Sequence, residues 1–360
     1  MTSSSRFPLL RLPSVALEHV LQTMDPFEII NFTMINAKTY YTMSLFSRSK
    51  FYFGYQLAIN IIKTPEPKFM IRGLHEDIEF YYQVTRDPTK HDTRESKKDS
   101  DGTRIEILWK YSEDVIAEFK RLYAYVKQFF SRPLIGVEMD MNLFGTEENK
   151  GIIDWLKSLE DYIGCGIIYG DLDTEDSADY FFKNLKFQDY LESRAELYSD
   201  FDLELLHYPK SLKIHHSCYV KMDFLLRMSI AKIQLWRSGL NSEDIKSFFK
   251  SWMASESNLE LRRFEIQLER WHRLEEIMDF PNRVTKTNER NEPFPAASSV
   301  FKTAKHVLMG AWTPRGQLEL QSKCPRGVHT PTKTCFAVLK TAGKLKIQIS
   351  VKLGMERVSP

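Results

Sequence analysis

The apolar and polar positions near the start of the chain follow a helical period. Four apolar residues keep the i, i+3, i+4, i+7 spacing of one helix face: Leu17, Val20, Leu21 and Met24. Ser14 precedes this face and is placed to cap the N-terminus of the helix. The pattern therefore predicts a first helix that follows Ser14 and ends near Met24.

A second helix is predicted to begin immediately after the first. In "DPFE", Asp25 can act as N-cap, Pro26 suits the first helical position, and Glu28 completes a capping box. The helix that follows is apolar on more than one face, with Phe27, Ile29, Ile30, Phe32, Met34 and Ile35. Two short helices with this much apolar surface need a further contact. That contact is either the rest of their own domain or a partner protein.

Short strands and one helix are predicted between residues 51 and 133. "KFMIRG", "IEFYYQVT" and "RIEILWKY" have the composition of β-strands. The polar run "RDPTKHDTRESKKDSDG" at residues 86–102 predicts a mobile loop. A helix follows from Val115 to Phe129, and "SRP" at residues 131–133 ends it.

From Leu134 onward, strand-like and helix-like segments alternate. The strand-like segments are "LIGVEMD", "CGIIYG", "SLKIHHS", "AKIQLW" and "RRFEIQL". Helical spacing lies between them at residues 152–159, 178–185 and 245–252, and a short apolar stretch lies at residues 222–228. Units of about twenty to thirty-odd residues are typical of leucine-rich-repeat-like arrays. Farther on, "GQLELQ" at 316–321 and "FAVLKT" with "LKIQISVK" at 336–352 predict a C-terminal β segment.

Alternation within the later strands predicts one covered face and one open face. The residues expected toward the helices are Leu212, Ile214, Ile233, Leu235, Phe264, Ile266 and Leu268. The residues expected on the open face are Lys213, His215, Gln234, Trp236, Arg263, Glu265 and Gln267. The alternative, a doubly wound sheet with helices on both sides, predicts continuous apolar runs. The observed alternation favours the open-faced arrangement.

Charge is unevenly distributed, although the whole chain carries a net charge of only +2. From Arg283 to the C-terminus there are fourteen Lys and Arg residues against four Asp and Glu residues, which leaves −8 on the remainder. A basic region of this kind suits nucleic acid or a solvated surface. The four cysteines have neither disulfide-framework nor zinc-site spacing. Without a signal peptide or a bilayer-length apolar run, we expect an intracellular protein, cytoplasmic and/or nuclear, with no membrane contact.

The candidate catalytic and metal-binding motifs lack the residues or the geometry that their chemistry requires. "TAGKLK" lacks the first glycine and the Ser/Thr of a phosphate-binding loop. "DLDTED" has Asp176 at the turn position and Phe182 at the final position of a calcium loop. His215 and His216 are neighbours in a predicted strand, so they point to opposite faces. We therefore expect no cofactor, no metal site, no catalytic residues and no enzymatic activity.

The opening segment resembles an F-box. In "FPLLRLPSVALEHVLQTMDPFEIINFTMINAK", the early Leu-Pro, the Asp-Pro step and the acidic residue followed by Ile-Ile all stand in the family's order. The amino-acid sequence of this segment is most similar to the F-boxes of the large nematode expansions. "INAKTYYTMS" departs from the family pattern, so the third F-box helix has no motif support. The resemblance implies that the helices bind a Skp-family adaptor through Leu12, Pro13, Leu17, Val20, Met24, Pro26, Ile29 and Ile30.

Residues 212–268 resemble the F-box-associated domain that accompanies such F-boxes. The similarity lies in the strand "LKIHHS", the helix "LNSEDIKSFFKSW" and the strand "NLELRRFEI". Together the two resemblances imply a non-enzymatic subunit of an SCF-type (Skp–cullin–F-box) ubiquitin ligase. Its cullin contact would run through the adaptor, and its protein substrate would bind the C-terminal domain. Two alternatives remain, an F-box interaction protein outside a ligase and a nucleic-acid-binding protein that uses the basic C-terminal region.

These features predict an α+β chain of four parts. Residues 6–50 form the F-box, and residues 51–133 form a strand-rich connector with a helix. Residues 134–280 form an irregular leucine-rich-repeat-like β–α array that contains the F-box-associated domain at about 203–270. Residues 281–360 form a loop and the C-terminal β segment. We expect the open-face residues Lys213, His215, Gln234, Arg263, Glu265 and Gln267 to bind substrate.

Overall fold

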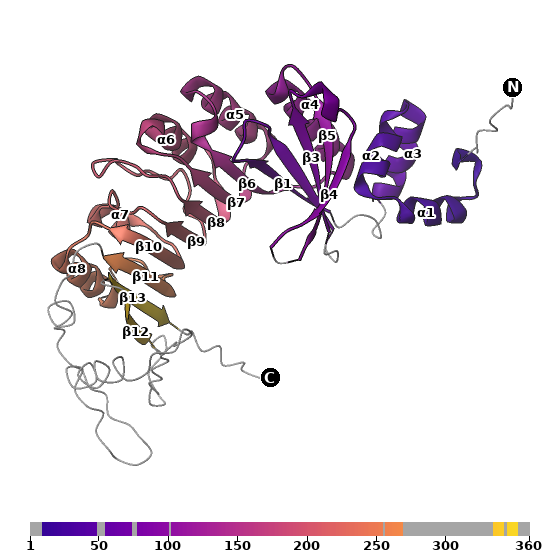
Figure 1. Cartoon of the computed structure of the whole chain (residues 1–360). Helices are drawn as coiled ribbons and strands as arrows, with labels where there is room; N and C mark the ends of the chain where they lie inside the picture. The colour runs from indigo at the N-terminus through magenta and orange to yellow at the C-terminus, as the bar shows by residue number, and fades with distance from the viewer. Residues whose placement is uncertain are drawn as a thin grey trace, which may run out of the picture. The chain divides into compact units, whose positions relative to one another are not determined.

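The computed structural model describes residues 9–48, 55–73, 78–100, 102–254, 256–268, 334–341 and 344–351. The fold is mixed α+β, and the chain divides into two compact units, Met1–Leu143 and Phe144–Pro360. Figure 1 shows their helices as coiled ribbons and their strands as arrows. The expected strand "GQLELQ" and most of the basic C-terminal region lie outside the described residues.

The first unit combines three N-terminal helices with a sheet and a longer helix. The helices are α1 (Ser14–Thr23), α2 (Pro26–Met34), α3 (Ala37–Arg48) and α4 (Val115–Phe130). The strands are β1 (Gln56–Ile61), β2 (Lys68–Arg72), β3 (Ile78–Thr85), β4 (Arg94–Lys98), β5 (Arg104–Tyr111) and β6 (Leu134–Asp140). Within this unit the strand order is β6-β1-β2-β3-β5-β4. Strand β1 is parallel to β6 and β3 is parallel to β5, whereas the other pairs are antiparallel.

Aromatic side chains hold α2 and α4 on the same face of this sheet. Phe27 of α2 meets the rings of Phe80 and Tyr82 edge-on at 5.4 and 4.9 Å between centroids. Phe69 of β2 stacks on Tyr82 at 5.2 Å and also contacts Tyr123 of α4 at 5.6 Å. Edge-on and stacked ring pairs of this kind add to the hydrophobic stabilisation of a core. Part of the surplus apolar surface of α2 is therefore used inside its own unit.

Three sequence expectations for the first unit need correction. The N-cap of α1 is Pro13 and makes no side-chain capping bond, so Ser14 is the first helical residue instead of the cap. The expected loop at 86–102 contains strand β4, which pairs antiparallel with β5. Strand β1 was not predicted. The capping box of α2 and the end of α4 at Ser131, which adopts a left-handed conformation (φ 50°), are confirmed.

The second unit is built from parallel strands with intervening helices. Its strands are β7 (Ile163–Tyr169), β8 (Phe187–Ser193), β9 (Ser211–Ile214), β10 (Lys232–Ser238) and β11 (Arg263–Leu268), all mutually parallel. The helices are α5 (Thr146–Leu159), α6 (Glu175–Asn184), α7 (Met222–Arg227) and α8 (Ser242–Met253). Strands β12 (Thr334–Thr341) and β13 (Lys344–Val351) pair antiparallel, and β13 pairs antiparallel with β11.

The helices of the second unit lie along one side of strands β7–β11 (Figure 1). Phe248 of α8 stacks on Phe264 of β11 at 4.7 Å between ring centroids, and Phe181 of α6 stacks on Phe187 of β8 at 5.3 Å. Gly166 makes room for Phe187, because a Cβ at this position would lie 2.4 Å from the ring. No described helix covers the opposite face of these strands. The expected open-faced arrangement is confirmed for the described residues.

Two further expectations in the second unit differ from the structure. Strand β8 was not predicted, although it lies between β7 and β9. The helical spacing predicted at residues 245–252 puts Trp252 on the covered face of its helix, but Trp252 is only half-buried. The aromatic core of α8 consists of Phe248 and Phe249, which are both buried.

Candidate interaction surfaces

The turn between α1 and α2 is tied to the sheet of the first unit. The Asp25 side chain accepts a hydrogen bond from the Glu28 backbone N–H at 2.9 Å, and Glu28 accepts one from the Asp25 N–H at 2.9 Å. Arg94 of β4 donates to the second carboxylate oxygen of Asp25 at 2.6 Å. Arg94 also contacts Glu106 at 2.8 Å and lies over the Phe27 ring at 5.4 Å. The capping carboxylate is thus shared between a helix and a strand.

The residues predicted to bind an adaptor lie at different depths. Leu17, Pro26, Ile29 and Ile30 are buried within the chain, Leu12, Val20 and Met24 are half-buried, and Pro13 is exposed. In this arrangement the four buried residues support the helices from inside. A docked protein would reach Leu12, Pro13, Val20 and Met24 first. Their role in adaptor binding stays a prediction.

The three N-terminal helices expose other large apolar side chains that the motif did not indicate. These are Val15, Met34, Ile35, Tyr41 and Leu45, and Ile35 is 65% exposed. Clustered exposed apolar side chains often mark protein interaction sites. The surplus of apolar residues in α2 was visible in the sequence. Which of them face outward depends on the packing of α2 against α4 and the sheet.

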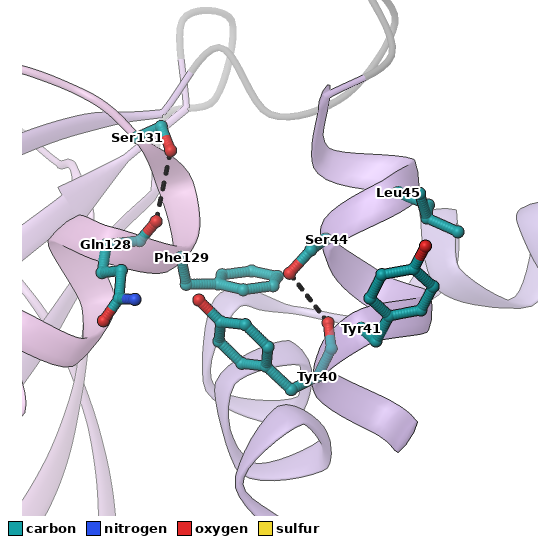
Figure 2. A pocket seen from close by; sticks show the side chains of 7 residues that line it. All are labelled: Tyr40, Tyr41, Ser44, Leu45, Gln128, Phe129 and Ser131. Atoms are coloured by element: carbon teal, nitrogen blue, oxygen red, sulfur yellow. Dashed lines mark hydrogen bonds between the residues drawn. The ribbon is translucent and has the colours of Figure 1, made fainter. Parts of the chain in front are cut away.

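A small pocket lies beside α3, against the C-terminal end of α4 (Figure 2). It is lined by Tyr40, Tyr41, Ser44, Leu45, Gln128, Phe129 and Ser131. The Ser44 hydroxyl donates to the Tyr40 carbonyl at 2.8 Å, and the Ser131 hydroxyl donates to the Gln128 carbonyl at 3.2 Å. The two serine hydroxyls are therefore hydrogen-bonded to the backbone one turn before them. No charged side chain lines the pocket.

The open face of the second unit centres on the buried carboxylate of Glu192. Its side chain is only 5% exposed. The Oε1 atom accepts hydrogen bonds from Arg194 Nε at 2.7 Å, His215 Nε2 at 2.6 Å and Lys213 Nζ at 3.2 Å. The Tyr190 hydroxyl donates to Oε2. One acidic side chain thus organises donors from β8, from β9 and from the residues that follow each strand.

Electrostatics keep this carboxylate ionised. Burial alone raises the pKa of Glu192, but hydrogen bonds from Tyr190, Arg194, His215 and Lys213 outweigh burial and lower the pKa to about 2. Burial lowers the pKa of His215, and this outweighs the opposing hydrogen bond to Glu192. The imidazole is therefore neutral at pH 7 and donates its Nε2–H to the carboxylate.

A second buried carboxylate lies on the same face. Glu265 of β11 is 1% exposed, accepts a hydrogen bond from Arg263 Nε at 2.6 Å and another from Gln234 Nε2 at 2.9 Å. The strand register places Glu192 opposite Lys213, Lys213 opposite Gln234, and Gln234 opposite Glu265. These residues form one continuous row across four strands.

Trp236 lies beside this row. Its ring meets the His215 ring at 4.4 Å between centroids, and Lys213 Nζ lies 4.8 Å from its centroid. Trp236 is half-buried, so part of the indole remains accessible between the polar residues.

The structure brings most of the predicted open-face residues together, with one correction. Lys213, His215, Gln234, Arg263 and Gln267 are half-buried on the open face, but Glu265 is buried beneath Arg263 and Gln234. Glu265 therefore supports its neighbours and does not offer an exposed charge. Substrate binding by these residues stays a prediction.

Sequence reasoning missed Tyr190, Glu192 and Arg194. The i, i+2, i+4 spacing of "YLESR" puts all three on one face of a strand, and this was the available signal. Asp189 and a bulge opposite Ile163–Cys165 interrupt the alternation that would have marked β8 as a strand.

In the described part of the chain, no group of three or more His, Cys, Asp or Glu side chains is arranged to hold a metal ion.

None of the described helices combines the length and the apolar character needed to cross a bilayer.

The region from Phe201 to Ile266 contains β9, α7, β10, α8 and most of β11, and it supplies much of the open face. Residues 200–266 match the sequence model of the F-box associated family. An F-box associated domain, which the resemblance predicted, is therefore found at residues 200–266. No curated protein and no solved structure matches the chain.

The F-box associated domain supplies three of the four strands in the row of the open face. Lys213, His215, Gln234, Trp236, Arg263 and Glu265 all belong to it, whereas Glu192 and Arg194 lie just before it. The family match suggests a substrate-recognition role of the kind associated with F-box proteins.

Proposed function

We propose that this chain is the substrate-recognition subunit of an SCF-type ubiquitin ligase. Helices α1–α3 would be the F-box that binds a Skp-family adaptor, and the adaptor would connect the chain to a cullin. The open face of the second unit, a leucine-rich-repeat-like array in this proposal, would bind a protein substrate. The observation that carries the proposal is the F-box associated domain at residues 200–266.

The N-terminal helices give independent support. The capping box at Asp25–Glu28 and the Leu12-Pro13 step follow the F-box pattern, and α3 is present although its sequence departs from that pattern. Ile35 and Tyr41 are exposed on these helices. An apolar surface of this type loses contact with water when a partner protein binds it.

The proposal assigns no catalytic step to this chain. Ubiquitin transfer would be carried out by the other ligase subunits, and the chain would contribute affinity and orientation. Such a subunit needs two independent binding surfaces, which the exposed apolar helices and the polar open face can provide.

The direct test is binding of purified full-length chain to a purified Skp-family adaptor. Leu12→Ala with Pro13→Ala should weaken binding by about thirtyfold or more, because truncated interface anchors often cost about 2 kcal/mol. Ile35→Asp should weaken binding as well, because it places a charge in the proposed apolar interface. Leu259→Asp is the matched control, since Leu259 is an exposed apolar residue of the other unit.

Each outcome has a defined meaning. Absence of adaptor binding by the unaltered chain contradicts the proposal. Adaptor binding without recruitment of a cullin identifies an interaction protein outside a ligase. Equal weakening by Ile35→Asp and Leu259→Asp would remove the F-box surface from the assignment.

A further inference from the structure

The open face of β8–β11 exposes positive charge and buries negative charge. Its described cationic side chains are Arg194, Lys213, Lys232 and Arg263. Its carboxylates, Glu192 and Glu265, are almost completely buried. A protein that approaches this face therefore meets the cationic groups first.

The buried carboxylates hold the two arginines in place. Arg194 is bound through Nε to Glu192, and Arg263 is bound through Nε to Glu265. Both arginine side chains nevertheless remain 42% exposed. A further carboxylate can approach the exposed part of each guanidinium, which is already oriented and loses little conformational freedom on binding.

Arg194 directly follows β8 and Arg263 is the first residue of β11, with β9 and β10 between these strands. Each arginine is bound to a carboxylate of the same cross-strand row, Glu192 or Glu265. Neighbouring strands are about 4.8 Å apart, so β8 and β11 are separated by about 14 Å across the sheet. An extended peptide rises by about 3.4 Å per residue, so two acidic residues four positions apart would span this distance. Lys213 and Lys232 lie on the strands between them.

Trp236 supplies the apolar component of the same surface. Its half-buried ring lies on β10, beside Lys213 and His215. Interface centres are enriched in aromatic residues and in arginine, which together combine apolar area with directed hydrogen bonds. The neutral His215 does not add to the positive charge.

We infer that this open face recognises an acidic, extended segment of a partner protein, with Arg194 and Arg263 contacting carboxylates and Trp236 contacting the segment between them. The inference deepens the proposed function and rests on it, because it names the chemistry of the substrate segment. Charge complementarity selects this occupant over a basic or purely apolar segment.

The experiment measures binding of the full-length chain to a fluorescent synthetic peptide with two glutamates four residues apart. The same peptide with glutamines at both positions is the ligand control. We expect the glutamate peptide to bind at least about tenfold more tightly and its binding to weaken as salt is added. Equal binding of the two peptides, or no measurable binding of either, would overturn the inference.

Protein variants locate the binding site. Arg194→Gln with Arg263→Gln should weaken the glutamate peptide by about tenfold or more. Lys232→Glu should weaken it too, without removing a partner from Glu192 or Glu265, so this variant serves if the double variant fails to fold. Arg121→Gln is the matched control, since Arg121 is an exposed, ion-paired arginine on α4 of the first unit. If Lys232→Glu and a folded Arg194→Gln, Arg263→Gln variant both bind the glutamate peptide with unchanged affinity, the peptide binds elsewhere.

Two parallel measurements distinguish this inference from a nucleic-acid-binding surface and from the ligase assignment. A single-stranded oligonucleotide that binds the same residues more tightly than the peptide would identify a nucleic-acid surface and overturn the inference. Adaptor binding is measured on the same preparations. Adaptor binding without peptide binding rejects the acidic-segment inference alone, whereas peptide binding without adaptor binding rejects the ligase assignment alone.

Discussion

At the scale of single residues, Glu192 makes most of its side-chain hydrogen bonds through one carboxylate oxygen. Its Oε1 atom is shared by Arg194, Lys213 and His215. A buried carboxylate is unfavourable unless charged and polar donors surround it, and removal of a buried charge from such a group leaves its partners uncompensated. Glu192 should therefore contribute to stability and also to the position of the exposed Arg194.

The first prediction concerns the pH dependence contributed by Glu192. Its pKa is lowered from 4.5 to about 2, so the stabilisation is fully present above pH 4.5 and is lost as the pH falls toward 2. The free energy involved is about 3 kcal/mol. Glu192→Gln should be less stable than the unaltered chain at pH 7, and the difference should disappear near pH 2. Urea unfolding at several pH values measures it.

The control for this prediction is Glu204→Gln, because Glu204 is 74% exposed and belongs to the same unit. Its unfolding free energy should track that of the unaltered chain at every pH. A Glu192→Gln variant with the same pH profile as the unaltered chain would show that the buried carboxylate is not stabilised in its ionised form.

At the scale of elements, the periodicity of apolar residues predicted most helices and strands but missed β1, β4 and β8. The helix at 115–130 keeps one apolar face, and the strands at 211–214, 232–238 and 263–268 alternate clearly. Strand β4 carries five exposed residues, so no apolar pattern marks it.

The candidate site was predictable only in part, because the pattern along one segment does not show which side chains of other strands contact it. Strand alternation placed Lys213, Gln234 and Arg263 on one face, but burial of Glu265 depends on how Arg263 and Gln234 close over it. Glu192 required the pairing of β8 with β9, which is a tertiary contact. A short-range pattern carries no information about such partners.

The second prediction compares two aromatic residues of α8. Phe248 is fully buried and stacks on Phe264, whereas Trp252 is half-buried. Phe248→Ala should cost about 3–5 kcal/mol of unfolding free energy, the usual range for a buried large aromatic. Trp252→Ala should cost clearly less despite the larger side chain. Chemical unfolding of both variants gives the comparison, and the opposite order would be inconsistent with the packing of α8.

At the scale of the whole molecule, the two compact units divide the proposed work. Exposed apolar helices belong to the first unit, and the charged open face belongs to the second. Variants in different units that share no partners should have additive effects. The two binding activities should therefore be separable by substitution.

The third prediction is this separation. Leu12→Ala with Pro13→Ala should lose adaptor binding and retain the affinity for the glutamate peptide. Lys232→Glu should show the reverse pattern. Titration of both ligands against both variants provides the four affinities, and a variant that loses both ligands while still folded would indicate one shared surface.

Strand β4 has a consequence for how the chain behaves in a crowded solution. It lies at the end of the first unit's strand order, and all five of its residues, Arg94–Lys98, are exposed. The edge of a sheet can recruit strands from other molecules, and charged residues, lysine above all, act as gatekeepers against such aggregation. Because "RESKK" places three cations on this edge, a second copy that aligned its own β4 alongside would meet electrostatic repulsion. The polar segment thus opposes polymerisation of a chain whose N-terminal helices expose apolar side chains.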